Sequence, residues 1–117
     1  MTQFVSSGDG TRIAYESRGA ASPALVLVHG WSCDRSYWDA QVKPLSREFR
    51  VVTIDLRGHG ESDAGRQEAS IAHFGTDVAT VVRHLGLKDV VLVGHSMGGA
   101  VILETANRLT RVVSGLI

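Results

Sequence analysis

Several features that commonly reveal a protein's function are scarce in this chain. It has one cysteine, Cys33, among 117 residues, so no disulfide can form within it. Its 12 basic side chains are balanced by 12 acidic ones, which leaves no positive surplus to attract nucleic acid or an anionic membrane. The longest strongly apolar run covers only residues 24–28, too short for a membrane span or a signal peptide. We therefore expect a cytoplasmic protein that binds neither nucleic acid nor membrane.

The apolar residues are nevertheless sufficient for one core. They make up 44% of the chain, and we expect residues 1–117 to form a single domain. Two short runs, residues 3–6 and 12–16, flank the turn signal Gly-Asp-Gly and predict an antiparallel hairpin. Strands of a buried parallel sheet are predicted by four further β-branched runs without polar alternation, at residues 24–28, 51–54, 90–93 and 112–117.

Segments with helical periodicity lie between these runs. Apolar residues recur at helical spacing over residues 38–49, which predicts a helix with Ser36 and Asp39 as its capping pair. Two more helices are predicted over residues 70–86 and 97–108. A hairpin followed by alternating strands and helices is typical of the α/β fold class, with the helices as crossovers between parallel strands.

One glycine-rich turn carries a candidate nucleophile. Residues 94–98, Gly-His-Ser-Met-Gly, lie between a predicted strand and a predicted helix. In a G-x-S-x-G pattern of this kind the serine occupies a sharp turn, and the glycines leave room for it. The N-terminus of the following helix favours an oxyanion beside Ser96, and the N–H of Met97 would be one donor. A glycine-rich turn without catalytic role is the alternative, whereas a dinucleotide site is disfavoured because the glycines do not form G-x-G-x-x-G.

Further motifs accompany this turn. Val-His-Gly-Trp, residues 28–31, closes one predicted strand, and Asp-Leu-Arg-Gly-His-Gly-Glu-Ser, residues 55–62, follows the next strand. Together with residues 94–98, these motifs resemble the α/β-hydrolase superfamily in its esterase- and lipase-like branch. The resemblance covers essentially the whole chain, and it places these residues in the N-terminal part of that fold.

The resemblance implies a mechanism and a site. Ser96 would be the nucleophile of a hydrolase that acts on an ester-like acyl bond without a metal or other cofactor. The backbone N–H of Trp31 would be a second oxyanion donor, and the Trp31 side chain would either line the acyl pocket or pack in the core. The residues expected to shape these loops are His29, Gly30, Gly94 and Gly98.

The resemblance also implies that part of a catalytic triad is missing. In this family the triad follows the order Ser, acid, His, and no histidine follows Ser96 before the chain ends in its sixth predicted strand. We therefore expect a hydrolase truncated in that strand, which self-associates or binds a complementing C-terminal half, and whose substrate is a small acyl compound. His59 is the one loop histidine that could approach Ser96, and Asp55 is expected to anchor its loop. A non-catalytic binding module, or an inactive fragment, is the alternative.

Overall fold

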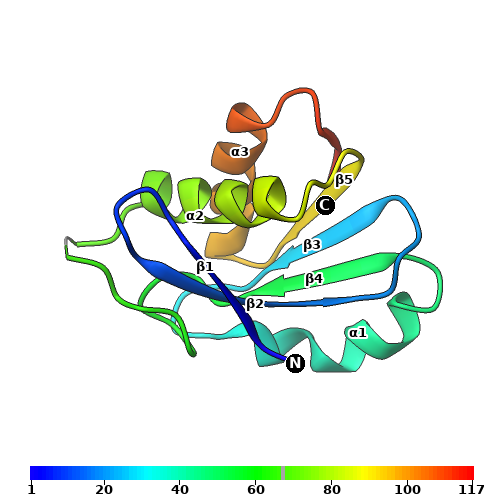
Figure 1. The fold of residues 1–117 in the computed structure, drawn as a ribbon, viewed down its shortest axis with the longest axis horizontal. Helices are drawn as coiled ribbons and strands as arrows, with labels where there is room; N and C mark the ends of the chain where they lie inside the picture. Colours follow the sequence, from blue (N-terminus) through cyan, green and yellow to red (C-terminus); the bar gives the residue numbers. More distant parts are fainter. Residues whose placement is uncertain (67) are drawn as a thin grey trace.

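A six-stranded sheet with helices on both faces forms the centre of the computed structural model, which describes residues 1–66 and 68–117 (Figure 1). In space the strands follow the order β1-β2-β4-β3-β5-β6. Their bounds are β1 Gln3–Ser6, β2 Arg12–Arg18, β3 Ala24–Val28, β4 Arg50–Ile54, β5 Val90–Gly94 and β6 Val113–Leu116.

The strand pairing confirms the predicted hairpin followed by parallel strands. β1, β2 and β4 pair antiparallel, while β4, β3, β5 and β6 run parallel to their neighbours. β2 continues to Arg18 instead of ending at residue 16, because its last residues pair with Val51 and Val52 of β4. β6 is shorter than the predicted 112–117 and only half-buried, since one side of it has no neighbouring strand among the described residues.

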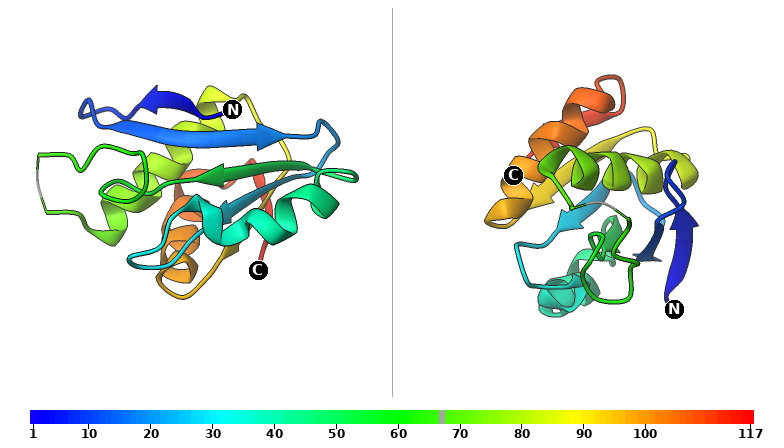
Figure 2. Two further views of the ribbon diagram at one scale, coloured as in Figure 1. Left: turned by 90° about the horizontal axis from the view of Figure 1, so that it is seen from below. Right: turned by 90° about the vertical axis from the view of Figure 1, so that its left-hand side faces the viewer.

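The helices divide between the two faces of the sheet. α2 (Ile71–His84) and α3 (Met97–Arg108) cover one face, and the 3₁₀ helix η1 (Arg35–Trp38) with α1 (Asp39–Leu45) covers the other (Figures 1 and 2). The main core lies on the α2–α3 side, where apolar side chains of the sheet pack against residues such as Phe74, Val78, Val82, Val101 and Ile102. No helix in the described part of the chain is both long and apolar enough to cross a membrane.

The beginning of the first helical segment was predicted wrongly. It starts at Arg35, and its N-cap is Asp34, whose side chain accepts a hydrogen bond from the Ser36 N–H at 2.8 Å. Ser36 and Asp39 therefore do not form the predicted capping pair. Asp34 is the N-cap because its backbone is extended, which is the conformation that an N-cap residue requires. The segment ends at Leu45, immediately after Pro44, and not at residue 49.

The α2 and α3 predictions are confirmed with small changes. Ser70 is the N-cap of α2, and its side chain forms a capping box with His73. α2 ends at His84, just before Gly86, which has a φ of 64°. α3 spans the predicted residues 97–108.

A buried ion pair connects α2 to the loop that follows β4. Asp77 of α2 is fully buried and accepts hydrogen bonds from Arg57 Nε at 2.6 Å and from Arg57 Nη2 at 2.8 Å. The Ser7 hydroxyl donates to the same carboxylate at 2.7 Å. The hydrogen bonds of the guanidinium to Asp77, and to Asp9, raise the pKa of Arg57 above its ordinary value. The loop after β4 and the turn of the β1–β2 hairpin are thus both fastened to α2.

Replacing Asp77 by alanine should destabilise the fold by ~3–5 kcal/mol, because the guanidinium of Arg57 would stay buried without its main partner. The exposed Glu48 provides a control, and Glu48→Ala should change the free energy of unfolding by less than ~0.5 kcal/mol. Urea unfolding of both variants at one protein concentration, followed by circular dichroism, measures the difference. A loss below ~1 kcal/mol in Asp77→Ala would show that the pair contributes little to the fold.

Candidate active site

The segments that carry the three sequence motifs meet at one end of the sheet. Val28, at the end of β3, pairs with Ile54 of β4 on one side and with Gly94 of β5 on the other. The residues that follow these three strands therefore leave the sheet side by side. Ligands of parallel sheets commonly bind outside the carboxyl ends of the strands, so this end is where a site is expected.

Ser96 occupies the turn between β5 and α3. Its backbone has a φ of 55° and a ψ of −119°, a conformation that residues other than glycine rarely adopt. Ser96 is exposed and holds the N-cap position of α3, yet its side chain makes no capping hydrogen bond. Its hydroxyl is therefore available at the surface, beside the N-terminus of a helix.

The backbone crowds tightly around this turn. A Cβ atom added to Gly94 would clash with the carbonyl group of Gly98, and a Cβ atom added to Gly98 would clash with the carbonyl oxygens of Val28 and His29. All of these contacts are with backbone, which cannot move aside like a flexible side chain. Glycine at both positions is therefore required for α3 to begin so close to the end of β3.

The loop after β3 lies directly against Ser96. A Cβ atom added to Gly30 would lie 3.1 Å from the carbonyl oxygen of His95 and 3.3 Å from the Cβ of Ser96. The Cys33 N–H donates to the carbonyl oxygen of Gly30 at 3.2 Å and closes the loop into a turn. Within the part of the chain that the structure describes, no hydrogen-bond acceptor is found for the N–H of Trp31 or of Met97.

The side chain of Trp31 is not part of the core. It is 66% exposed, which excludes packing in the core, one of its two predicted roles. Its ring meets the ring of His59 edge-on, with the centroids 5.5 Å apart. Tyr37 of η1 stacks on His95 with centroids 4.5 Å apart. Aromatic side chains thus lie on the surface around the Ser96 turn.

His29 is a buried link between two loops. Its Nδ1 donates to the carbonyl oxygen of Gly30 at 2.7 Å, and its Nε2 accepts from the Leu56 N–H at 3.1 Å. Burial lowers the pKa of His29 below its ordinary value, which favours the neutral ring that this pattern of bonds requires. Both ring nitrogens are engaged, so His29 has no free nitrogen for proton transfer.

His59 is also engaged through both ring nitrogens. Its Nδ1 lies 2.9 Å from the carbonyl oxygen of Arg57, and its Nε2 accepts from the Ser32 N–H at 3.1 Å. The ring packs between three others, at centroid distances of 5.0 Å from His29, 5.5 Å from Trp31 and 6.0 Å from Phe74. His59 therefore supports the loop after β3, and to act as a base it would have to release Ser32.

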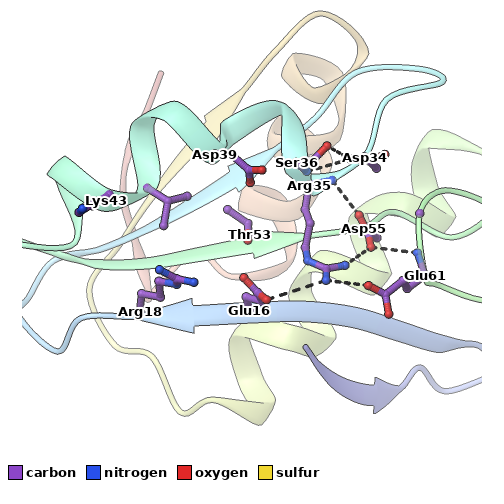
Figure 3. Close-up of a pocket in the computed structure, with 12 residues that line it drawn as sticks. Glu16, Arg18, Asp34, Arg35, Ser36, Asp39, Lys43, Thr53, Asp55 and Glu61 are labelled. Atoms are coloured by element: carbon purple, nitrogen blue, oxygen red, sulfur yellow. Dashed lines mark hydrogen bonds and ion pairs between the residues drawn. The ribbon is translucent and has the colours of Figure 1, made fainter. Parts of the chain in front are cut away.

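Asp55 anchors its loop, as predicted. Its buried carboxylate accepts hydrogen bonds from the backbone N–H of Arg35 at 2.7 Å and of Glu61 at 3.0 Å. The Arg35 guanidinium forms an ion pair with the same carboxylate and with Glu61 (Figure 3). Sequence reasoning missed Arg35, because no motif connects it to an aspartate so far along the chain.

A charged cavity of about 630 Å³ lies beside this pair, on the α1 face of the sheet. Figure 3 shows Glu16 and Arg18 of β2 on one wall and Asp39 and Lys43 of α1 on the other. Neither Ser96 nor the N–H groups of Trp31 and Met97 line it. The cavity is therefore separate from the Ser96 turn, which lies at the surface.

Comparison with known proteins agrees with this architecture. The sequence model of the alpha/beta hydrolase fold family matches residues 23–117. A non-heme haloperoxidase of Rhodococcus erythropolis is 43% identical over 96% of the chain and 40% of its own length. A bifunctional esterase/perhydrolase of Acinetobacter calcoaceticus is 41% identical over 82% of the chain and 36% of its own length. The chain thus spans about 40% of the length of such relatives.

Solved structures give the same result. An esterase from Exiguobacterium antarcticum superimposes with a TM-score of 0.92 and 31% identity, over 99% of this chain and 44% of that one. An N-acyl homoserine lactone degrading enzyme superimposes with a TM-score of 0.91 and 32% identity, over 97% and 43% of the two chains. The chain therefore belongs to the α/β-hydrolase-fold family, of which it contains the hairpin, the first parallel strands and the turn between β5 and α3.

Proposed function

We propose that this chain is the nucleophile-bearing part of a serine hydrolase that cleaves an ester-like acyl bond. Ser96 is the nucleophile, and the N–H groups of Trp31 and Met97 are the oxyanion donors. The main support is the backbone of Ser96, which has a positive φ at a strand-to-helix turn against which the loop of Gly30 is packed. Relatives named as esterases favour an ester substrate for the complete protein.

The proposed reaction is acyl transfer in two steps. Ser96 Oγ attacks the carbonyl carbon of the substrate while its proton passes to a base, and the carbonyl oxygen becomes an oxyanion held by the two N–H groups. The leaving alcohol departs with a proton, and an acyl ester remains on Ser96. Water then attacks this ester in the same way and releases the acid.

The base in this proposal comes from outside the described residues. His29 and His59 use both ring nitrogens in bonds to the loops, and His73 and His84 belong to α2. His95 stacks on Tyr37 beside the turn. In the order of the family's triad, the acid and the histidine follow the serine along the chain. The loop-shaping roles of His29, Gly30, Gly94 and Gly98 form part of the same proposal.

Ser96 should be acylated slowly when the chain is incubated with an activated ester such as p-nitrophenyl acetate. Without a triad base, the rate of ester cleavage should exceed that in water by no more than about 10³- to 10⁴-fold. Mass spectrometry of a protease digest locates the acetyl group. Ser96→Ala should abolish the adduct, whereas Ser6→Ala, at an exposed serine of β1, should leave it unchanged.

An adduct that persists in Ser96→Ala would refute the nucleophile assignment. If the unaltered chain, the Ser6→Ala variant and the Ser96→Ala variant all remain free of acetyl groups, the alternative of a non-catalytic module is favoured.

Gly30→Ala should slow the acylation of Ser96 by about 10- to 100-fold, because the added methyl group crowds His95 and Ser96 and displaces the proposed Trp31 donor. Gly8→Ala is the matched control, since a Cβ atom there meets nothing within 4 Å. Rates of adduct formation are compared after circular dichroism has shown that both variants are folded. Equal rates in Gly30→Ala and Gly8→Ala would argue against a donor in this loop.

We also propose that the outer edge of β6 recruits a further polypeptide, either a second copy or a complementing C-terminal segment. Leu116, the last residue of β6, is 44% exposed, and Ile117 after it is 75% exposed. Unpaired apolar edges commonly pair with other chains. The isolated chain should therefore sediment as dimers or larger species at roughly tens of micromolar. Leu116→Lys should shift the distribution toward monomer. A purely monomeric wild-type chain would contradict pairing with a second copy and leave only the complementing segment.

A further inference from the structure

Ser32 has an unusual backbone conformation that needs a physical explanation. Among the described residues, the non-glycine residues with positive φ are Ser32, at 60°, and Ser96, at 55°. Both belong to the candidate active site. Such a conformation is strained and persists only where a contact with the surroundings holds it in place. The question is therefore which contact holds Ser32.

The imidazole of His59 supplies that contact. The Ser32 N–H donates to His59 Nε2 at 3.1 Å, across 27 positions of the sequence. An imidazole nitrogen accepts a hydrogen bond only when it carries no proton. The other nitrogen, Nδ1, lies 2.9 Å from the carbonyl oxygen of Arg57, which can only accept. These two bonds are satisfied together by one form of the ring, the neutral tautomer with its proton on Nδ1.

The ring is itself held firmly. Its Nδ1 partner is the backbone of Arg57, a residue that is 2% exposed and fixed by its ion pair with Asp77. Phe74 of α2 and Trp31 of the loop both meet the ring edge-on. A continuous set of contacts thus runs from α2 through Arg57 and His59 to Ser32.

The bond to Ser32 determines the orientation of a peptide group next to the proposed oxyanion donor. The Ser32 N–H belongs to the peptide that joins Trp31 to Ser32. Fixing this plane restricts the rotation of Trp31 about its own Cα–C bond, and the peptide that carries the Trp31 N–H lies just before it. On the other side, Gly30 is confined by His95 and Ser96. The Trp31 N–H is therefore held between two fixed points.

We infer that His59 is a positioning residue, which as the neutral Nδ1–H tautomer holds the Trp31–Ser32 peptide and thereby keeps the Trp31 N–H directed at the oxyanion. The part of this inference that concerns the oxyanion rests on the proposed function. The tautomer and the bond to Ser32 do not, so they can be tested without any activity.

The first test is nuclear magnetic resonance of the full chain with ¹⁵N-labelled histidine. Long-range proton–nitrogen spectra distinguish a protonated ring nitrogen from an unprotonated one, and the signals of His59 are assigned as those missing from His59→Gln. We expect a protonated Nδ1 and an unprotonated Nε2 in the neutral ring. A proton on Nε2 would overturn the inference, because the Ser32 N–H would then have no acceptor.

The second test uses two replacements of different chemistry. His59→Phe keeps a ring between Trp31 and Phe74 but offers no acceptor, whereas the side-chain oxygen of His59→Gln can reach the place of Nε2. Hydrogen exchange of the Ser32 amide should become at least about tenfold faster in His59→Phe and change less than about threefold in His59→Gln. His84→Gln, at an exposed histidine of α2, should leave it unchanged.

The acylation of Ser96 by p-nitrophenyl acetate is then measured in the same variants. It should slow by about tenfold or more in His59→Phe and be restored to within about threefold in His59→Gln, because a displaced donor loses part of its effect. If Ser32 exchange responds but acylation does not, the role of His59 toward the oxyanion is refuted. If the wild-type chain is not acylated at all, the proposed function fails, while the tautomer and the exchange rates still decide whether His59 holds Ser32.

Discussion

The close approach of α3 to the end of β3 is the constraint on which the site depends. Gly98 lies so near the carbonyl oxygens of Val28 and His29 that no side chain fits between them. The His95 N–H donates to the Val28 carbonyl oxygen at 3.0 Å, so the chain must turn within one residue to enter α3. That residue is Ser96, and the short turn explains both its positive φ and the exposure of its side chain.

Polar contacts between distant residues hold the surrounding loops, which have no regular structure of their own. Asp77 fixes Arg57, His29 joins the loops after β3 and β4, and Asp55 binds Arg35. Such bonds are strong only when every partner is present, because a buried polar group without a partner is costly. The loops around Ser96 are thus held by side chains of α2 and η1 and by residues that directly follow β3 and β4. A change in one of them reaches the site through its partner.

Much of this arrangement could be predicted from local patterns in the sequence. The bounds of β3 and α3 match because each is marked by a continuous apolar run or a glycine turn, and the position of Ser96 follows from its near neighbours. The cap of η1 was missed, since Asp34 and Ser36 are both good capping residues and only the backbone conformation selects between them. The roles of Arg35 and Ser32 could not be predicted from local patterns, because their partners Asp55 and His59 lie 20 and 27 positions further along the chain.

We propose that Ser96 is a nucleophile that faces two backbone N–H donors. A crystal structure of the chain phosphonylated by an aryl phosphonofluoridate tests it most directly, because the tetrahedral phosphorus mimics the intermediate of acyl transfer. We expect phosphorus on Ser96 Oγ, with its free oxygen about 2.7–3.1 Å from the backbone nitrogens of both Trp31 and Met97. Phosphorus on another residue, or an oxygen that neither N–H contacts, would contradict it.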